Sequence, residues 1–98
     1  MDKSHAKKVL QEAREEIDQI DRTIIELISK RTDLAEQILD AKIALDMSIE
    51  DNEREKIVHK KASKAAKELQ IDENMLNQIM NILTDINKQK QEEILQRK

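Results

Sequence analysis

The sequence predicts an all-α protein, a three-helix chain with a very long first helix. Three observations predict this fold class. The 98 residues contain no Gly and no Pro, the two residues that interrupt helices most strongly. Ala, Glu, Lys, Leu and Arg are abundant, as they are in long helices. Apolar residues recur at steps of three and four, which places them on one helix face.

The first helix is predicted from about Lys7 to Leu45. Its apolar positions are Leu10, Ala13, Ile17, Ile20, Ile24, Leu27, Leu34, Ile38, Ala41 and Leu45. At ~1.5 Å per residue this helix would span roughly 55–60 Å. A compact domain of this size has a radius of gyration of only ~13 Å. A helix of that length needs cover from outside its own compact fold.

Two shorter helices are expected after it. The apolar pattern lapses at residues 46–50, and Asp51 or Asn52 can cap a second helix that runs to about Leu69. A second break at residues 70–72 ends in a capping Asp72, and a third helix runs from residue 73 to about Leu95. We expect residues 1–98 to form a single domain, with residues 1–6 as a frayed tail.

The composition limits the core and the possible partners. Charged residues make up 40% and hydrophobic residues 38%, none of them aromatic, so burying helix faces between two chains would enlarge a thin core. The absence of Cys excludes disulfides and thiol ligands. The start has no hydrophobic signal region, and no run approaches the ~18 apolar residues of a membrane span, so a cytoplasmic protein is expected. The net charge of −3 argues against nucleic acid as a partner.

Each predicted helix replaces some apolar seam positions with polar ones. These residues are Arg31 and Lys42 in the first helix, Asp51, Arg54 and Glu55 in the second, and Asn87 and Gln91 in the third. Arg31 and Lys42 share a face, ~16 Å apart, and could hold a compact anion. Buried polar groups are costly unless they satisfy one another or a ligand. The residues alone therefore leave an interhelical salt-bridge network and an anion site both open.

Five segments, in order and at these spacings, resemble the all-helical (AroQ-type) chorismate mutases. They are Arg14-Glu15-Glu16-Ile17-Asp18-Gln19-Ile20-Asp21, Lys30-Arg31, Lys42, Asp51-Asn52-Glu53-Arg54-Glu55 and Asn87-Lys88-Gln89-Lys90-Gln91. The last segment most resembles stand-alone archaeal members. The resemblance implies an intertwined antiparallel homodimer that rearranges chorismate to prephenate in aromatic amino acid biosynthesis. That [3,3] rearrangement is unimolecular and needs no metal or cofactor.

The resemblance also implies roles for the cations and their neighbours. Arg14 and Arg31 would hold the two substrate carboxylates, and Lys42 and Gln91 would donate hydrogen bonds to the ether oxygen. Arg14 lies seventeen residues before Arg31, or ~25 Å along a straight helix, so one chain cannot bring both to one small ligand. We therefore expect Arg14 to act from the partner chain.

The remaining roles concern the second and third helices. Glu55 would accept from the ring hydroxyl, assisted by the backbone near Asp51, and Arg54 would support this acidic pair or contact substrate. Asn87, counted among the substrate-binding residues, stands where many members have Ser. At two further positions, Thr84 and Lys88, some bacterial members have apolar residues in the pocket wall.

Two other functions are weighed against this one. An isochorismate-pyruvate lyase shares the fold and the cationic set, but an apolar residue typically replaces the mutase acid that Glu55 supplies here. A non-enzymatic helical dimerisation module would not need converging polar groups at seam positions. A metal site at Glu55 and His59, four residues apart on one face, lacks further ligands in the sequence.

Overall fold

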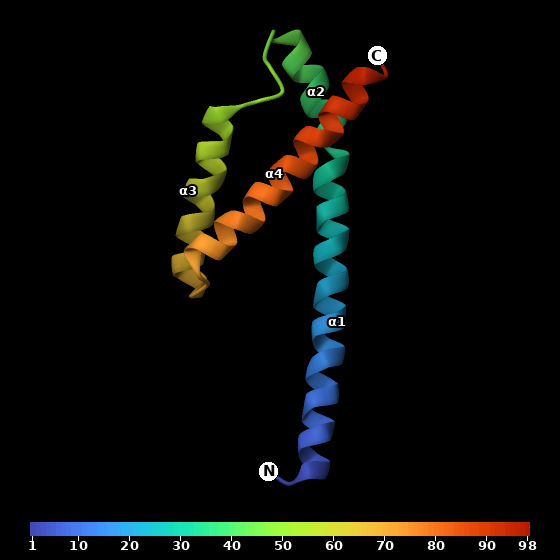
Figure 1. The fold of residues 1–98 in the computed structure, drawn as a ribbon, viewed down its shortest axis with the longest axis vertical. Coiled ribbons are helices and arrows are strands. Elements are labelled where there is room, and N and C mark those ends of the chain that lie inside the picture. Colours follow the sequence, from blue (N-terminus) through green and yellow to red (C-terminus); the bar gives the residue numbers. More distant parts are fainter. The chain divides into compact units, whose positions relative to one another are not determined.

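The computed structural model describes residues 1–98, which form helices and no strands. The helices are α1 (Lys3–Asp33), α2 (Ala35–Ala44), α3 (Asn52–Leu69) and α4 (Glu73–Gln96), coloured in chain order in Figure 1. The chain divides into two compact units, Met1–Lys30 and Arg31–Lys98. None of the helices combines the length and the apolar character that a membrane span requires. The predicted all-α class is confirmed.

The first unit consists of most of α1. The helix begins earlier than the predicted start near Lys7, because Asp2 Oδ1 accepts a hydrogen bond from the His5 N–H at 2.8 Å. None of its residues is buried. Its apolar side chains are about half exposed, at 49–56%: Leu10, Ile17, Ile20, Ile24 and Leu27. The predicted apolar face of this helix is therefore present but uncovered within the chain.

The long helix predicted to continue to Leu45 is divided at Leu34. The backbone angles of Leu34 (φ −73°, ψ −10°) remain helical, so the interruption is local. The Asn87 Nδ2 donates to the carbonyl oxygen of Arg31 at 2.9 Å. In a regular helix this carbonyl accepts from the N–H of Ala35. A side chain that enters the backbone ladder at this point accounts for the break, and the prediction of one uninterrupted helix is wrong here.

The starts of α3 and α4 confirm the predicted capping residues. Asp51 Oδ1 accepts from the Arg54 N–H at 3.1 Å, and Asp72 Oδ1 accepts from the Met75 N–H at 2.8 Å. Each carboxylate satisfies one of the backbone donors that a helix leaves unpaired in its first turn. These caps fix where α3 begins, and α3 carries the polar residues of the site in its first turn.

The two breaks between helices also lie where the sequence predicts them. Asp46 (φ 55°) and Gln70 (φ 57°) take left-handed backbone conformations just after α2 and α3. Beyond Asp46, the Met47 N–H donates to the Lys42 carbonyl at 2.8 Å, which is the long bond of a Schellman motif. The segment between α2 and α3 therefore turns back over the end of α2, close to Lys42.

Within the second unit, α4 packs against both α2 and α3 (Figure 1). Asn77 on α4 joins α3 through hydrogen bonds with Ser63 Oγ (3.1 Å) and His59 Nδ1 (2.7 Å). Four apolar side chains are buried, namely Ala35, Leu39, Ala62 and Ala66. Three polar side chains are buried with them: Lys42, Asn87 and Gln91. Since buried polar groups are costly, these three mark the place to look for a site.

Candidate active site

A cavity of about 440 Å³ opens in the second unit, among α2, the segment after it, the first turns of α3, and α4. Ligand cavities commonly fall in this size range. Its apolar lining residues are Leu34, Ile38, Ala41, Leu45, Met47, Ile49 and Val58. Its polar lining residues are Arg31, Lys42, Asp51, Arg54, Glu55, Thr84, Asn87, Lys88 and Gln91. Four of these side chains are cationic and two are anionic, so the lining favours a ligand with negative charge.

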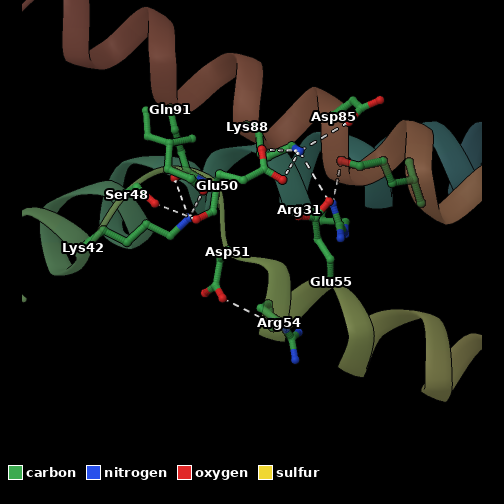
Figure 2. A network of polar contacts seen from close by, with 12 residues as sticks. Arg31, Lys42, Ser48, Glu50, Asp51, Arg54, Glu55, Asp85, Lys88 and Gln91 are labelled. Carbon is green, nitrogen blue, oxygen red and sulfur yellow. Dashed lines mark hydrogen bonds and ion pairs between the residues drawn. The ribbon is translucent and has the colours of Figure 1, made fainter. Parts of the chain in front are cut away.

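Lys42 supplies the most buried cation of the cavity, with 9% of the residue exposed. Its Nζ donates to the carbonyl oxygen of Ile49 at 2.7 Å and to Gln91 Oε1 at 3.1 Å (Figure 2). An ammonium group has three hydrogens. These two bonds hold Lys42 in place and leave a third hydrogen for a ligand in the cavity.

Gln91, 3% exposed, is held by partners on both ends of its amide. Its Oε1 accepts from Lys42, and its Nε2 donates to Asn87 Oδ1 at 2.7 Å. A primary amide has two N–H donors, so the second hydrogen of Nε2 is available to a ligand. Lys42 and Gln91 thus form a pair of fixed donors on one wall of the cavity.

The Arg31 side chain, near the end of α1, places its guanidinium against α4. Its Nη1 donates to the Leu83 carbonyl at 2.7 Å. Burial, and to a lesser degree the positive charge of Arg54, lower the pKa of Arg31. Arginine nevertheless stays charged in proteins. A bound anion would offset both the lost hydration and the repulsion between the two guanidinium groups.

Lys88 ties together the segment after α2, α3 and α4. Its Nζ lies 3.1 Å from Glu50 Oε2, 3.3 Å from Glu55 Oε1 and 3.8 Å from Asp85 Oδ1 (Figure 2). The hydrogen bond with Glu50 raises the pKa of Lys88, and the same bond is the main cause that lowers the pKa of Glu50. Lys88, at a predicted position of the pocket wall, is therefore a charged side chain that is paired with three carboxylates.

Glu55 has one oxygen satisfied and one not. Its Oε1 accepts from Lys88, whereas Oε2 is buried and has no hydrogen-bond partner. A buried unpaired acceptor is costly and is usually explained by a function. Since Glu55 lines the cavity, Oε2 is a ready acceptor for a donor group of a ligand.

The structure gathers seven of the eight predicted site residues around this cavity: Arg31, Lys42, Asp51, Arg54, Glu55, Asn87 and Gln91. Arg14 lies on α1 in the other unit, where it is exposed beside Lys7 and Asp18. His59, weighed above as a metal ligand, instead bonds Asn77. No group of three or more His, Asp or Glu side chains is arranged to hold a metal ion.

Three groups of the site escaped the sequence analysis. They are the ammonium of Lys88 as a partner of Glu55, and the carbonyl oxygens of Ile49 and Leu83 as acceptors for Lys42 and Arg31. Backbone acceptors leave no trace in the residue pattern. Lys88, however, adjoins Asn87 and is opposite in charge to Glu55, which is the signal that could have found it.

Comparison with known proteins identifies the family of the chain. Residues 13–92 match the model of the family described as chorismate mutase type II. The chain is 39% identical over 87 residues to the chorismate mutase of Methanocaldococcus jannaschii, a match that covers 89% of this chain and 88% of that protein. It is 32% identical over 72 residues to the bifunctional chorismate mutase/prephenate dehydratase of Buchnera aphidicola, covering 74% of this chain and 19% of the relative. No solved structure gave a significant match.

The fold and the cavity thus define an all-α enzyme with a cationic site. The chain belongs to the type II chorismate mutase family, and its function is that of a chorismate mutase, an isomerase.

Proposed function

We propose that the cavity of the second unit converts chorismate to prephenate as part of the biosynthesis of aromatic amino acids in the cytoplasm. The observation that carries this proposal is the combination of groups on its walls. An excess of cations suits the two carboxylates of the substrate, two buried donors suit its ether oxygen, and the unpaired Glu55 Oε2 suits its ring hydroxyl. The archaeal relative named above supports the same substrate.

The reaction divides into positioning and charge stabilisation. Arg31 binds one carboxylate, and its planar guanidinium fixes the carboxylate orientation. Glu55 accepts from the ring hydroxyl, with the backbone near Asp51 assisting and Arg54 supporting the acidic pair. These contacts hold the enolpyruvyl group over the ring, which removes much of the entropic barrier of a unimolecular rearrangement.

Lys42 and Gln91 act on the bond that breaks. As the C–O bond lengthens, the ether oxygen gains negative charge, and the remaining hydrogens of Lys42 Nζ and Gln91 Nε2 stabilise it. Both donors are held by hydrogen bonds before the substrate binds, so they need no reorganisation during the reaction. No nucleophile forms a covalent intermediate in this mechanism.

The second substrate carboxylate binds Arg14 of a partner chain. Arg14 and Arg31 are seventeen residues apart in sequence, which corresponds to ~25 Å along a helix. The half-exposed apolar face of α1 gives a second chain a surface to cover. We therefore infer an intertwined antiparallel homodimer in which each cavity is completed by the guanidinium of the other chain.

A side-by-side assay of chorismate and isochorismate tests this function. We expect chorismate consumption with prephenate as the product, and little release of pyruvate from isochorismate, because the acid at Glu55 is retained. Preferential release of pyruvate from isochorismate would assign the chain to the lyases instead. A chain that consumes neither compound would refute the enzymatic role of the cavity.

A further inference from the structure

Asn87 lies between Arg31, which is proposed to bind a substrate carboxylate, and Gln91, which is proposed to donate to the ether oxygen. Its Oδ1 accepts from Gln91 Nε2 at 2.7 Å, and its Nδ2 donates to the backbone carbonyl of Arg31 at 2.9 Å. Gln91 Oε1 continues the series by accepting from Lys42 Nζ at 3.1 Å. Three buried side chains, Lys42, Gln91 and Asn87, thus form an unbroken series of hydrogen bonds that ends on the backbone of α1.

The direction of this series is fixed at both ends. Lys42 has only donors to offer, so the Gln91 oxygen must face it, whereas a carbonyl such as that of Arg31 can only accept. The Asn87 nitrogen must therefore face Arg31, which leaves the Asn87 oxygen for Gln91 Nε2. An amide at residue 87 can accept from Gln91 and donate to Arg31 at the same time.

The same contact coincides with the break between α1 and α2. The Arg31 carbonyl would otherwise accept from the Ala35 N–H, and the break falls at Leu34, between these two residues. The interruption lies three residues after Arg31, whose guanidinium donates to the Leu83 carbonyl. Asn87 is thus linked to the local backbone that carries Arg31 as well as to Gln91.

We propose that Asn87 is a positioning residue that orients the Gln91 amide toward the reacting ether oxygen, in place of the direct substrate contact implied by the resemblance. The inference rests on the proposed function of Gln91. Without the bond to Asn87, the Gln91 amide is held only by the bond from Lys42 to its oxygen, and its N–H that faces the cavity is less firmly oriented. The loss should fall on kcat more than on KM, because the donor acts in the transition state.

Replacing Asn87 with Asp supplies the sharpest test. The carboxylate can still accept from Gln91, but its second oxygen faces the Arg31 carbonyl, and two acceptors at this distance repel. Protonation converts that oxygen into a donor and restores the series. Burial raises the pKa of such a carboxyl group, so its titration should become visible in the pH dependence of the rate.

The measurement is kcat/KM of Asn87→Asp, Asn81→Asp and the parent protein between about pH 5 and pH 8. Asn81, exposed on the same helix, is the matched control. We expect the control to follow the parent, and Asn87→Asp to be ~10- to 100-fold slower at the alkaline end, with most of the rate regained at the acid end. An unchanged rate, or a deficit that is constant with pH, would overturn the proposal.

A second variant keeps the test decisive if Asn87→Asp does not fold. If Asn87 acts through Gln91, then Asn87→Ser should slow the parent protein but have little further effect in a Gln91→Ala background. Additive losses in this double-mutant cycle would show that Asn87 acts independently of Gln91, and would refute the inference.

One readout does not require turnover. The side-chain amide resonances of Gln91 report whether Nε2 is hydrogen-bonded, and Asn87→Ser should shift them, whereas Asn81→Asp should not. Unshifted Gln91 resonances would contradict the positioning role whatever the rate of chorismate consumption. An inactive parent protein with the expected resonance shift would instead count against the proposed function alone.

Discussion

Changing Gln91 to Glu replaces an amide whose two ends face opposite kinds of partner. The oxygen end faces Lys42 Nζ at 3.1 Å, and a carboxylate oxygen could accept the same hydrogen bond from Lys42. The nitrogen end faces Asn87 Oδ1 at 2.7 Å, a distance at which two acceptors repel. The carboxyl group therefore needs a proton on that oxygen before it can donate to the ether oxygen of the substrate, and it cannot donate to Asn87 as well, because it has one hydrogen where the amide nitrogen has two.

The size of the effect follows from the lost donor. Removal of one donor that stabilises developing negative charge costs about 3 kcal/mol, or roughly 10²-fold in rate. The ionised variant should show this full loss. Above the pKa of the new carboxyl group, each fall of one pH unit should recover about tenfold in rate until the protonated form predominates. The parent protein should show no such requirement, because an amide does not titrate.

The assay is kcat/KM for chorismate across about pH 5 to 8, with Gln89→Glu on the exposed side of α4 as the control. A variant that loses activity equally at every pH would refute the reasoning, because the defect would then be one of shape and not of the missing hydrogen. A variant as active as the parent at alkaline pH would refute it as well.

Three further predictions follow from other contacts. Glu55→Gln should lower kcat/KM by ~10-fold or more, because the buried unpaired oxygen loses its charge as an acceptor; wild-type kinetics would contradict the role given to it. The pairing of Lys88 with Glu50 should stabilise the fold between the unfolded-state pKa of Glu and that of Lys, and this stability should be lost in acid as Glu50 is protonated and in alkali as Lys88 is neutralised. In chemical unfolding curves measured at a series of pH values, Lys88→Met should reduce the loss of stability at both ends of the pH range. Unaltered curves would exclude the pairing. Ile20→Glu should dissociate the proposed dimer in sedimentation velocity, whereas Gln19→Glu should not; an intact Ile20→Glu dimer would place the interface elsewhere.

Local signals in the sequence predict much of the fold. The 3.6-residue periodicity and the absence of Gly and Pro give the helices, and capping carboxylates at Asp51 and Asp72 give two of their starts. The break at residues 46–50 is marked by a lapse of the apolar pattern, and the break at residues 70–72 ends in the capping Asp72. Of the seven polar residues predicted at seam positions, Lys42, Asn87 and Gln91 are buried, whereas Arg54 is exposed.

Contacts between distant residues set the limit of that prediction. The break at Leu34 depends on an amide that lies more than fifty residues away in sequence, so no pattern within α1 could indicate it. The pairing of Lys88 with Glu50 and Glu55 depends on how far long side chains reach between helices. The backbone acceptors of Lys42 and Arg31 depend on where chain segments lie in space.

The most direct test of the account is activity in mixed dimers of Arg14→Ala and Arg31→Ala. Each variant alone should be inactive, because every cavity would then lack one of the two guanidinium groups that we propose to bind the substrate carboxylates. After co-refolding, half of the dimers should be mixed, and one of the two cavities in each should be intact, so about a quarter of the parent activity should return. Absence of any recovery, with subunit exchange confirmed, would show that Arg14 does not complete the partner's cavity.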